Sequence, residues 1–121
     1  MTEPRQVALE VLYELEQNPE ATFEEAGLPQ KTVRLGRGVQ EHRAEIDQQI
    51  EDASEHWRLA RMPVVDATVL RIGTFELMHD DTPVAVVINE AVELAKTYST
   101  QGSGGFVNGL LSGVAEAVRT N

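Results

Sequence analysis

The sequence predicts an all-α protein, a compact bundle of about five to seven helices. Apolar residues recur at intervals of three and four along most of the 121 positions, which is the period of an amphipathic helix. No segment keeps up the alternation of apolar and polar residues that a half-buried strand requires. With 41% apolar residues the chain can bury a hydrophobic core, and its length fits a single domain, residues 1–121.

The first predicted helix covers residues 4–17. Its apolar face contains Val7, Val11 and Leu15, spaced by four, with Ala8 and Leu12 beside them. Pro4 suits a first helical turn, where the missing N–H is not needed. Residues 21–31 are expected to hold one short helical turn and then a loop, because glycine and proline interrupt the pattern there.

A long helix is predicted from Thr32 to Trp57. Its narrow apolar stripe consists of Leu35, Val39, Ile46, Ile50, Ala53 and Trp57. Charged residues fill most of the remaining surface, as expected for a solvated outer face. Gly36 and Gly38 either weaken the first turns of this helix or mark a close contact.

The segment after Pro63 is apolar around much of its circumference, which predicts a central helix over residues 64–80. A turn then leads to a helix over 84–98, for which Thr82 is the expected cap and Pro83 the expected first residue. The β-branched start of this segment would also suit a strand. We favour a helix because the apolar face continues at helical spacing.

The last predicted helix follows the stretch "STQGSGG" and carries Phe106, Leu110 and Val114 on its apolar face. Glycines at the start of a helix expose backbone N–H groups to an anion, but they also serve simple chain reversal. Gly105, Gly109 and Gly113 recur every four residues. This spacing predicts a bare stripe that lets another helix approach closely.

The composition argues against most enzyme chemistries. There is no cysteine, which excludes disulfides, thiolate metal sites and cysteine nucleophiles. The histidines, His42, His56 and His79, lie far apart and form no i, i+4 pair, so neither a metal site nor a cofactor is predicted. The sequence contains no nucleophile elbow and no phosphate-binding loop. We therefore expect a protein that is not an enzyme.

The charge balance restricts the kinds of partner. The chain has 20 acidic and 10 basic residues, a net charge of -10 that is the wrong sign for binding nucleic acid by the overall field. Any contact with RNA is therefore expected to be local. No apolar run approaches the roughly 18 residues of a membrane span, and the first residues do not resemble a signal peptide. A cytoplasmic location without membrane contact is expected.

Three side chains are candidates either for the core or for RNA. Asn108 is a poor helix former whose amide could bind the preceding turn or the edge of a base. Tyr13 and Phe106 lie near apolar faces, where packing is the ordinary role. At the rim of a core, an aromatic ring can instead stack on an unpaired base, a contact worth roughly 1–3 kcal/mol.

Several stretches resemble the NusB family of transcription antitermination factors. The most specific is "PVAVVINEAVELAKTYSTQGSGGFVNGLLSGVAEAVR", residues 83–119, which is similar to the family's C-terminal signature. The stretch "ATVLRIGTFEL", residues 67–77, resembles the helix before it, and "RQVALEVLYELEQ", residues 5–17, resembles the first helix. The resemblance covers nearly the whole chain and implies a helical bundle of the NusB type.

The resemblance also implies a function and a set of contacts. Members of the family bind the boxA element of nascent ribosomal RNA together with the small-subunit ribosomal protein NusE, and they help the RNA polymerase antitermination complex to pass terminators. The residues implied on the RNA side are Arg5, Tyr13, Gly105, Phe106 and Asn108. The residues assigned to the protein partner are Phe75, Glu76, Asp80 and Asp81.

One departure from the family pattern affects RNA binding. Where the family shows a cluster of arginines before the first helix, this chain has Arg5 alone. We therefore expect weak RNA binding without the partner, since fewer phosphates are neutralised. Two other functions stay open: an accessory domain linked to ribosomal RNA methylation, and a scaffold that binds only protein. The sequence also leaves a monomer and a homodimer open.

Overall fold

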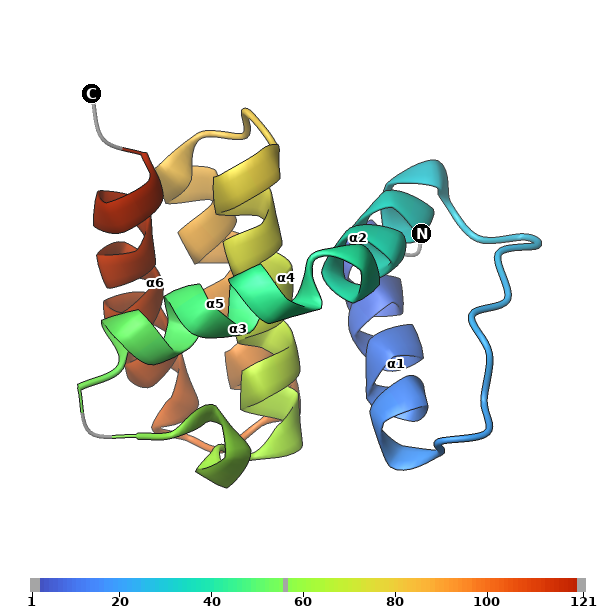
Figure 1. The fold of residues 1–121 in the computed structure, drawn as a ribbon, viewed down its shortest axis with the longest axis horizontal. Coiled ribbons are helices and arrows are strands. Elements are labelled where there is room, and N and C mark those ends of the chain that lie inside the picture. The colour runs from blue at the N-terminus through green and yellow to red at the C-terminus, as the bar shows by residue number, and fades with distance from the viewer. Residues whose placement is uncertain (1–2, 56, 120–121) are drawn as a thin grey trace.

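The computed structural model describes residues 3–55 and 57–119, and their fold is helical (Figure 1). The six α-helices and one short 3₁₀ helix, η1, are α1 (Pro4–Gln17), α2 (Gln30–Glu41), α3 (Arg43–Ala53), η1 (Leu59–Arg61), α4 (Val64–His79), α5 (Val84–Tyr98) and α6 (Ser103–Val118). No strand occurs in the two described ranges. The prediction of an all-α fold with five to seven helices is confirmed.

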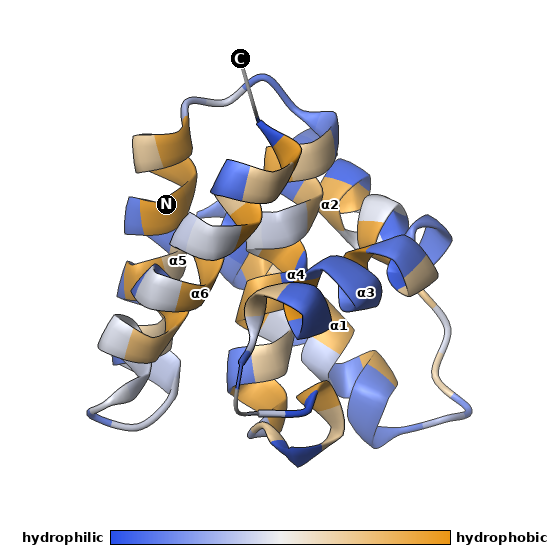
Figure 2. Cartoon of the chain, turned by 60° about the vertical axis from the view of Figure 1, so that its left-hand side comes forward, coloured by the Kyte–Doolittle hydropathy of each residue, from blue (hydrophilic) through white to orange (hydrophobic). Residues whose placement is uncertain are grey.

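Helix α4 lies at the centre of the fold and contacts each of the other five α-helices. Every residue from Asp66 to Leu77 is buried, as expected for a helix that is apolar on most sides. Helices α5 and α6 pack beside α4, and α1 and α2 form a pair on its other side (Figure 1). Helix α3 crosses α4 and α6 and presents a largely hydrophilic outer surface (Figure 2).

The prediction of one long helix from residue 32 to residue 57 is wrong, because the chain breaks at His42 into α2 and α3. A straight helix of that length would measure about 39 Å at 1.5 Å per residue, longer than this small core can cover. The break lets α2 pack on α1 while α3 reaches α6. Val39 and Ile46, seven residues apart across the break, are both buried, so the apolar spacing gave no sign of it.

Trp57 does not belong to the apolar stripe. Helix α3 ends at Ala53, and the indole is 56% exposed. The Ser54 hydroxyl donates to the Trp57 carbonyl at 2.6 Å and accepts from the Trp57 N–H at 3.2 Å. Such local serine contacts compete with helical hydrogen bonding and turn the chain.

Proline sets the start of three helices. Pro29, Pro63 and Pro83 occupy the position just before α2, α4 and α5, each in an extended conformation. The expectation that Thr82 caps α5 is wrong, since Pro83 is the cap residue and no side chain caps this helix. Helix α1 differs, because the Glu3 carboxylate accepts a hydrogen bond from the Gln6 N–H at 3.0 Å.

The glycines that permit close packing are not those of the predicted stripe. A β-carbon at Gly105 or Gly109 would meet nothing within 4 Å, and one at Gly113 would make only ordinary contact. At Gly38, by contrast, it would collide with the Phe75 ring, and at Gly73 it would lie 2.8 Å from a methyl carbon of Leu111. Gly105 and Gly109 therefore face outward, a β-carbon at Gly113 would be in ordinary contact with Ala53 of α3, and the close approaches at Gly38 and Gly73 involve α4.

Candidate functional site

Arg5 lies inside the protein and joins α1 to α4. Its guanidinium donates from Nε and Nη2 to the two carboxylate oxygens of Glu76, both at 2.8 Å. Arg5 is 9% exposed and Glu76 is 1% exposed. Burial lowers the pKa of Arg5, but the hydrogen bonds and charge of Glu76 outweigh this effect and raise that pKa above its usual value. This geometry gives Arg5 a structural role and argues against its use as an RNA contact.

The four residues assigned to the protein partner differ in how deeply their side chains are buried. Phe75 and Glu76 are buried on α4, so they offer no surface to another molecule. Asp80 follows α4, and its side chain is only 8% exposed because it pairs with Arg34. Asp81 is exposed in the turn before α5. Of this set, Asp81 alone has an open side chain.

Tyr13 is exposed on α1, where it forms part of a hollow. Tyr13 and Tyr98 are 39% and 38% exposed. They line the hollow with Leu9, Glu10 and Val65, and the surface between the two phenol rings is mainly apolar. Two exposed aromatic rings beside an apolar floor can accept a flat apolar group such as a base.

The start of α6 forms a second hollow, of about 270 Å³. Phe106 is half-buried in its wall, which the exposed Trp57 and the residues Met62 and Pro63 also line. Gly105 and Asn108 are exposed on the same helix. The Ser112 hydroxyl donates to the backbone carbonyl of Asn108 at 2.8 Å, and the Asn108 side chain is exposed.

A buried carboxylate holds the loop between α5 and α6. Asp66 is 4% exposed and accepts from the Ser99 hydroxyl at 2.5 Å and from the Ser103 hydroxyl at 3.0 Å. Asp66 lies in the first turn of α4, and its neighbour Val65 lines the Tyr13 hollow. The start of α4 therefore separates the Tyr13 hollow from the Phe106 hollow and fixes the loop beside it.

Two exposed arginines near Trp57 were missed by the sequence reasoning. Arg58 precedes η1 and Arg61 ends it. Within the described residues neither makes an ion pair, whereas Arg34, Arg37 and Arg43 each pair with a carboxylate. The sequence signal available was two arginines close to an aromatic residue. That signal was hidden because Trp57 was placed in a helix.

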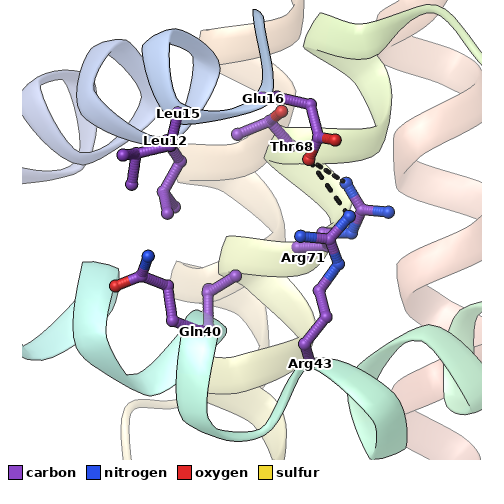
Figure 3. A pocket seen from close by; sticks show the side chains of 8 residues that line it. Leu12, Leu15, Glu16, Gln40, Arg43, Thr68 and Arg71 are labelled. Atoms are coloured by element: carbon purple, nitrogen blue, oxygen red, sulfur yellow. Dashed lines mark hydrogen bonds and ion pairs between the residues drawn. The ribbon is translucent and has the colours of Figure 1, made fainter. Parts of the chain in front are cut away.

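A third hollow, of about 180 Å³, lies between α1 and α4 near the break at His42 (Figure 3). Arg71 donates from Nε to Asp47 at 2.8 Å and lies 3.5 Å from Glu16. Arg43 contacts the same Glu16 oxygen at 3.0 Å. These charges satisfy one another across three helices, so the hollow is a structural ion-pair network.

None of the helices in the described residues is long and apolar enough to cross a membrane. The arrangement found here, with α4 enclosed by five other helices and two open hollows at its start, defines a small all-α binding module. The model of the NusB family matches residues 2–116, and the chain belongs to this family.

The chain is similar to proteins named transcription antitermination protein NusB from several bacteria. It is 42% identical to the one from Anaeromyxobacter sp. (strain Fw109-5) over 126 residues, which cover 94% of this chain and 88% of that protein. It is 43% identical to the one from Lysinibacillus sphaericus, covering 94% and 95%. Against that of Anaeromyxobacter dehalogenans (strain 2CP-1) the identity is 54%, but the match spans only 69% of this chain and 59% of the relative.

Two solved structures share the fold. One is NusB of T. maritima, with a TM-score of 0.82, 34% identity and coverage of 95% of this chain and 92% of that one. The other is a crystal structure of the antitermination factors NusB and NusE in complex with double-stranded RNA, with a TM-score of 0.81, 26% identity and 94% coverage of both chains.

Proposed function

We propose that this chain is a cytoplasmic transcription antitermination factor that binds boxA RNA of nascent ribosomal RNA together with NusE and supports read-through by RNA polymerase. The observation that carries the proposal is the family match over residues 2–116. The related fold bound to NusE and RNA supports it. The role is one of binding, in which shape, stacking and charge select the partners.

The RNA surface we propose extends along the start of α6 and η1. Phe106 and Trp57 supply two aromatic rings at one hollow, and Asn108 supplies an exposed side-chain amide on the same helix as Phe106. Arg58 follows Trp57 in the chain and Arg61 ends η1, and both are exposed and supply positive charge. This combination of stacking groups beside arginines is typical of single-stranded RNA sites. Tyr13, across the start of α4, extends the same surface.

The proposal keeps the expectation of weak RNA binding by the chain alone. Arg5 is held by Glu76, and the net charge of -10 opposes the approach of phosphates. A partner with a basic surface would reduce this repulsion. The exposed Asp81 and the acidic surface of the chain would favour the encounter with such a partner.

The proposal is tested by fluorescence anisotropy of labelled boxA RNA with the chain, with and without NusE. We expect boxA to bind more tightly than a scrambled RNA in the presence of NusE. The double variant Arg58→Ala/Arg61→Ala should weaken this binding and lower the slope of log K against log salt, by about 0.7 for each lost phosphate contact.

The matched control is Arg37→Ala, which removes an exposed arginine that pairs with Glu25 on another part of the surface. This variant should leave the slope of log K against log salt for boxA binding unchanged. Equal binding of boxA and scrambled RNA with NusE present would contradict the proposed function and favour a scaffold that binds only protein. Loss of affinity in both arginine variants alike would contradict the proposed RNA surface.

A further inference from the structure

Two histidines and a glutamate that are distant in the sequence meet at one point of the surface. His42 lies between α2 and α3, Glu45 is in the first turn of α3, and His79 is the last residue of α4. The Oε1 atom of Glu45 lies 2.7 Å from Nδ1 of His42 and 3.0 Å from Nε2 of His79. The potential ligand atoms of the three side chains all lie within 4.8 Å of one another.

The fold supports the two imidazole rings from one side. Their centroids are 4.1 Å apart with an interplanar angle of 26°, and the Phe75 ring stacks at 5.4 Å from His79 and 6.1 Å from His42. Phe75 can lie there because Gly38 has no side chain in its way. Arg34 donates to the His79 carbonyl and pairs with Asp80, so its positive charge is balanced.

The same cluster is open on its outer side. The side chains of His42, His79 and Glu45 are 37%, 31% and 50% exposed, respectively. A hydrated ion can therefore reach all three without any movement of the backbone.

We propose that His42, Glu45 and His79 form a binding site for one divalent transition-metal ion, with Zn²⁺ as the reference ion. Two imidazole nitrogens and one carboxylate oxygen are a ligand set that Zn²⁺ uses, with water completing the coordination. In the present arrangement one carboxylate oxygen faces a nitrogen of each ring. If each neutral ring carries its proton on the other nitrogen, both lone pairs become available to an ion at that point.

Coordination requires a small side-chain rearrangement. The rings are close to parallel, so each must rotate until the lone pairs of Nδ1 of His42 and Nε2 of His79 converge on the ion at about 2.0–2.1 Å. Exposure of all three side chains leaves room for this rotation. The bound ion would connect α3 to the end of α4, and it would be selected by nitrogen ligands over Mg²⁺ or Ca²⁺, which prefer oxygen.

The test is a competition titration with a chromophoric chelator, using the full chain after removal of any purification tag. We expect one Zn²⁺ per chain and binding of Ni²⁺ at the same site, with no competition from millimolar Mg²⁺. His42→Gln, His79→Gln and Glu45→Gln should each weaken Zn²⁺ binding by roughly 10-fold or more, since each removes one of three ligands.

Two control variants should keep the affinity. Asp52→Asn removes an exposed carboxylate from the same helix, and His56→Gln removes the third histidine, which lies outside the described residues. Circular dichroism checks that all variants fold. Loss of binding in either control as large as in His42→Gln, or equal affinity in all variants, would overturn the assignment of these three ligands.

A second readout identifies the ligand atoms. In ¹⁵N spectra of the imidazole rings, Zn²⁺ should shift Nδ1 of His42 and Nε2 of His79, and the other nitrogen of each ring should carry the proton. Zn²⁺ should also raise the melting temperature of the parent chain and not that of Glu45→Gln, because an ion that binds only the folded state stabilises it. Shifts confined to His56 would overturn the proposal.

Discussion

Arg5 and Glu76 show how a single charged residue changes its role once its neighbours are known. A lone arginine at the start of a first helix suggests a contact with phosphate, yet the structure turns it inward onto a carboxylate that is 1% exposed. A buried carboxylate needs a partner, because removal of one member of the pair leaves an uncompensated charge in a medium of low polarity. The pair therefore fixes α1 against α4.

Substitution of this arginine should reveal the structural role. Arg5→Ala should lower the free energy of unfolding by about 3 kcal/mol, because Glu76 then has Lys31, at 3.5 Å, as its one ion-pair partner among the described residues. Urea denaturation followed by circular dichroism measures the change. Arg37→Ala, at an exposed ion pair, should cost less than about 1 kcal/mol. A smaller loss for Arg5→Ala than for Arg37→Ala would contradict this role.

Two glycines of the chain should respond in opposite directions to alanine. Gly38→Ala places a methyl group against the Phe75 ring and should destabilise the fold by about 1–3 kcal/mol through overpacking. Gly109→Ala adds a methyl group in open space on the exposed face of α6 and should stabilise it by up to about 1 kcal/mol. Thermal unfolding compares the two variants, and a stabilising Gly38→Ala would show that the ring is free to move.

At the scale of the element, apolar spacing predicts most of the helices. Four predicted segments match α1, α4, α5 and α6 closely, and the prediction of α4 as the central helix is confirmed by its contacts. The spacing fails at His42 because a seven-residue step preserves the apolar face whether or not the helix is continuous. Whether a helix breaks at such a point depends on how it packs against distant parts of the chain. The local sequence alone does not predict that packing.

The candidate site was less predictable than the helices. Asp66 contacts Ser99 and Ser103, which are 33 and 37 residues away, and no local pattern links them. The sequence predicts no metal site at His42 and His79, because ligand pairs are usually recognised by short spacing, but the fold stacks their rings. The residues at the start of α6 were named from their sequence motif, and their part in RNA binding stays a prediction.

The contacts of Asp66 should hold the loop between α5 and α6 in place. Asp66→Ala removes the acceptor of the Ser99 hydroxyl and leaves Ser103 with only its contacts to the Ser99 and Thr100 hydroxyls among the described residues, which should cost about 1–3 kcal/mol. In Asp66→Ala, amide hydrogen exchange in residues 99–104 should become faster than in the parent chain. The exchange rate in α2 should rise less. The control is Asp81→Ala at the exposed turn before α5, where exchange in that loop should not change. Equal exchange in both variants would mean that the loop is held by other contacts.

For the whole molecule, the distribution of charged residues over the surface matters more for partner binding than the net charge does. Most of the 10 basic residues are engaged in ion pairs or in hydrogen bonds to backbone carbonyls, as Arg119 is at the end of α6. Among the described residues, the exposed arginines without an ion pair are Arg58 and Arg61. Arg58 lines a hollow together with Glu51, Asp52 and Glu55. An acidic surface that carries a few unpaired arginines can serve two partners of opposite charge, provided that each partner meets a different part of it.

This arrangement predicts opposite effects of one variant on the two partners. Arg58→Ala/Arg61→Ala makes the chain more negative, so it should weaken boxA binding while leaving the association rate with NusE unchanged or faster. Stopped-flow measurements between about 50 and 300 mM salt should show the NusE rate falling with ionic strength in both forms, because screening shortens the range of the attraction. A slower NusE association in the double variant would place both partners on the same arginines, and the two surfaces would then have to overlap.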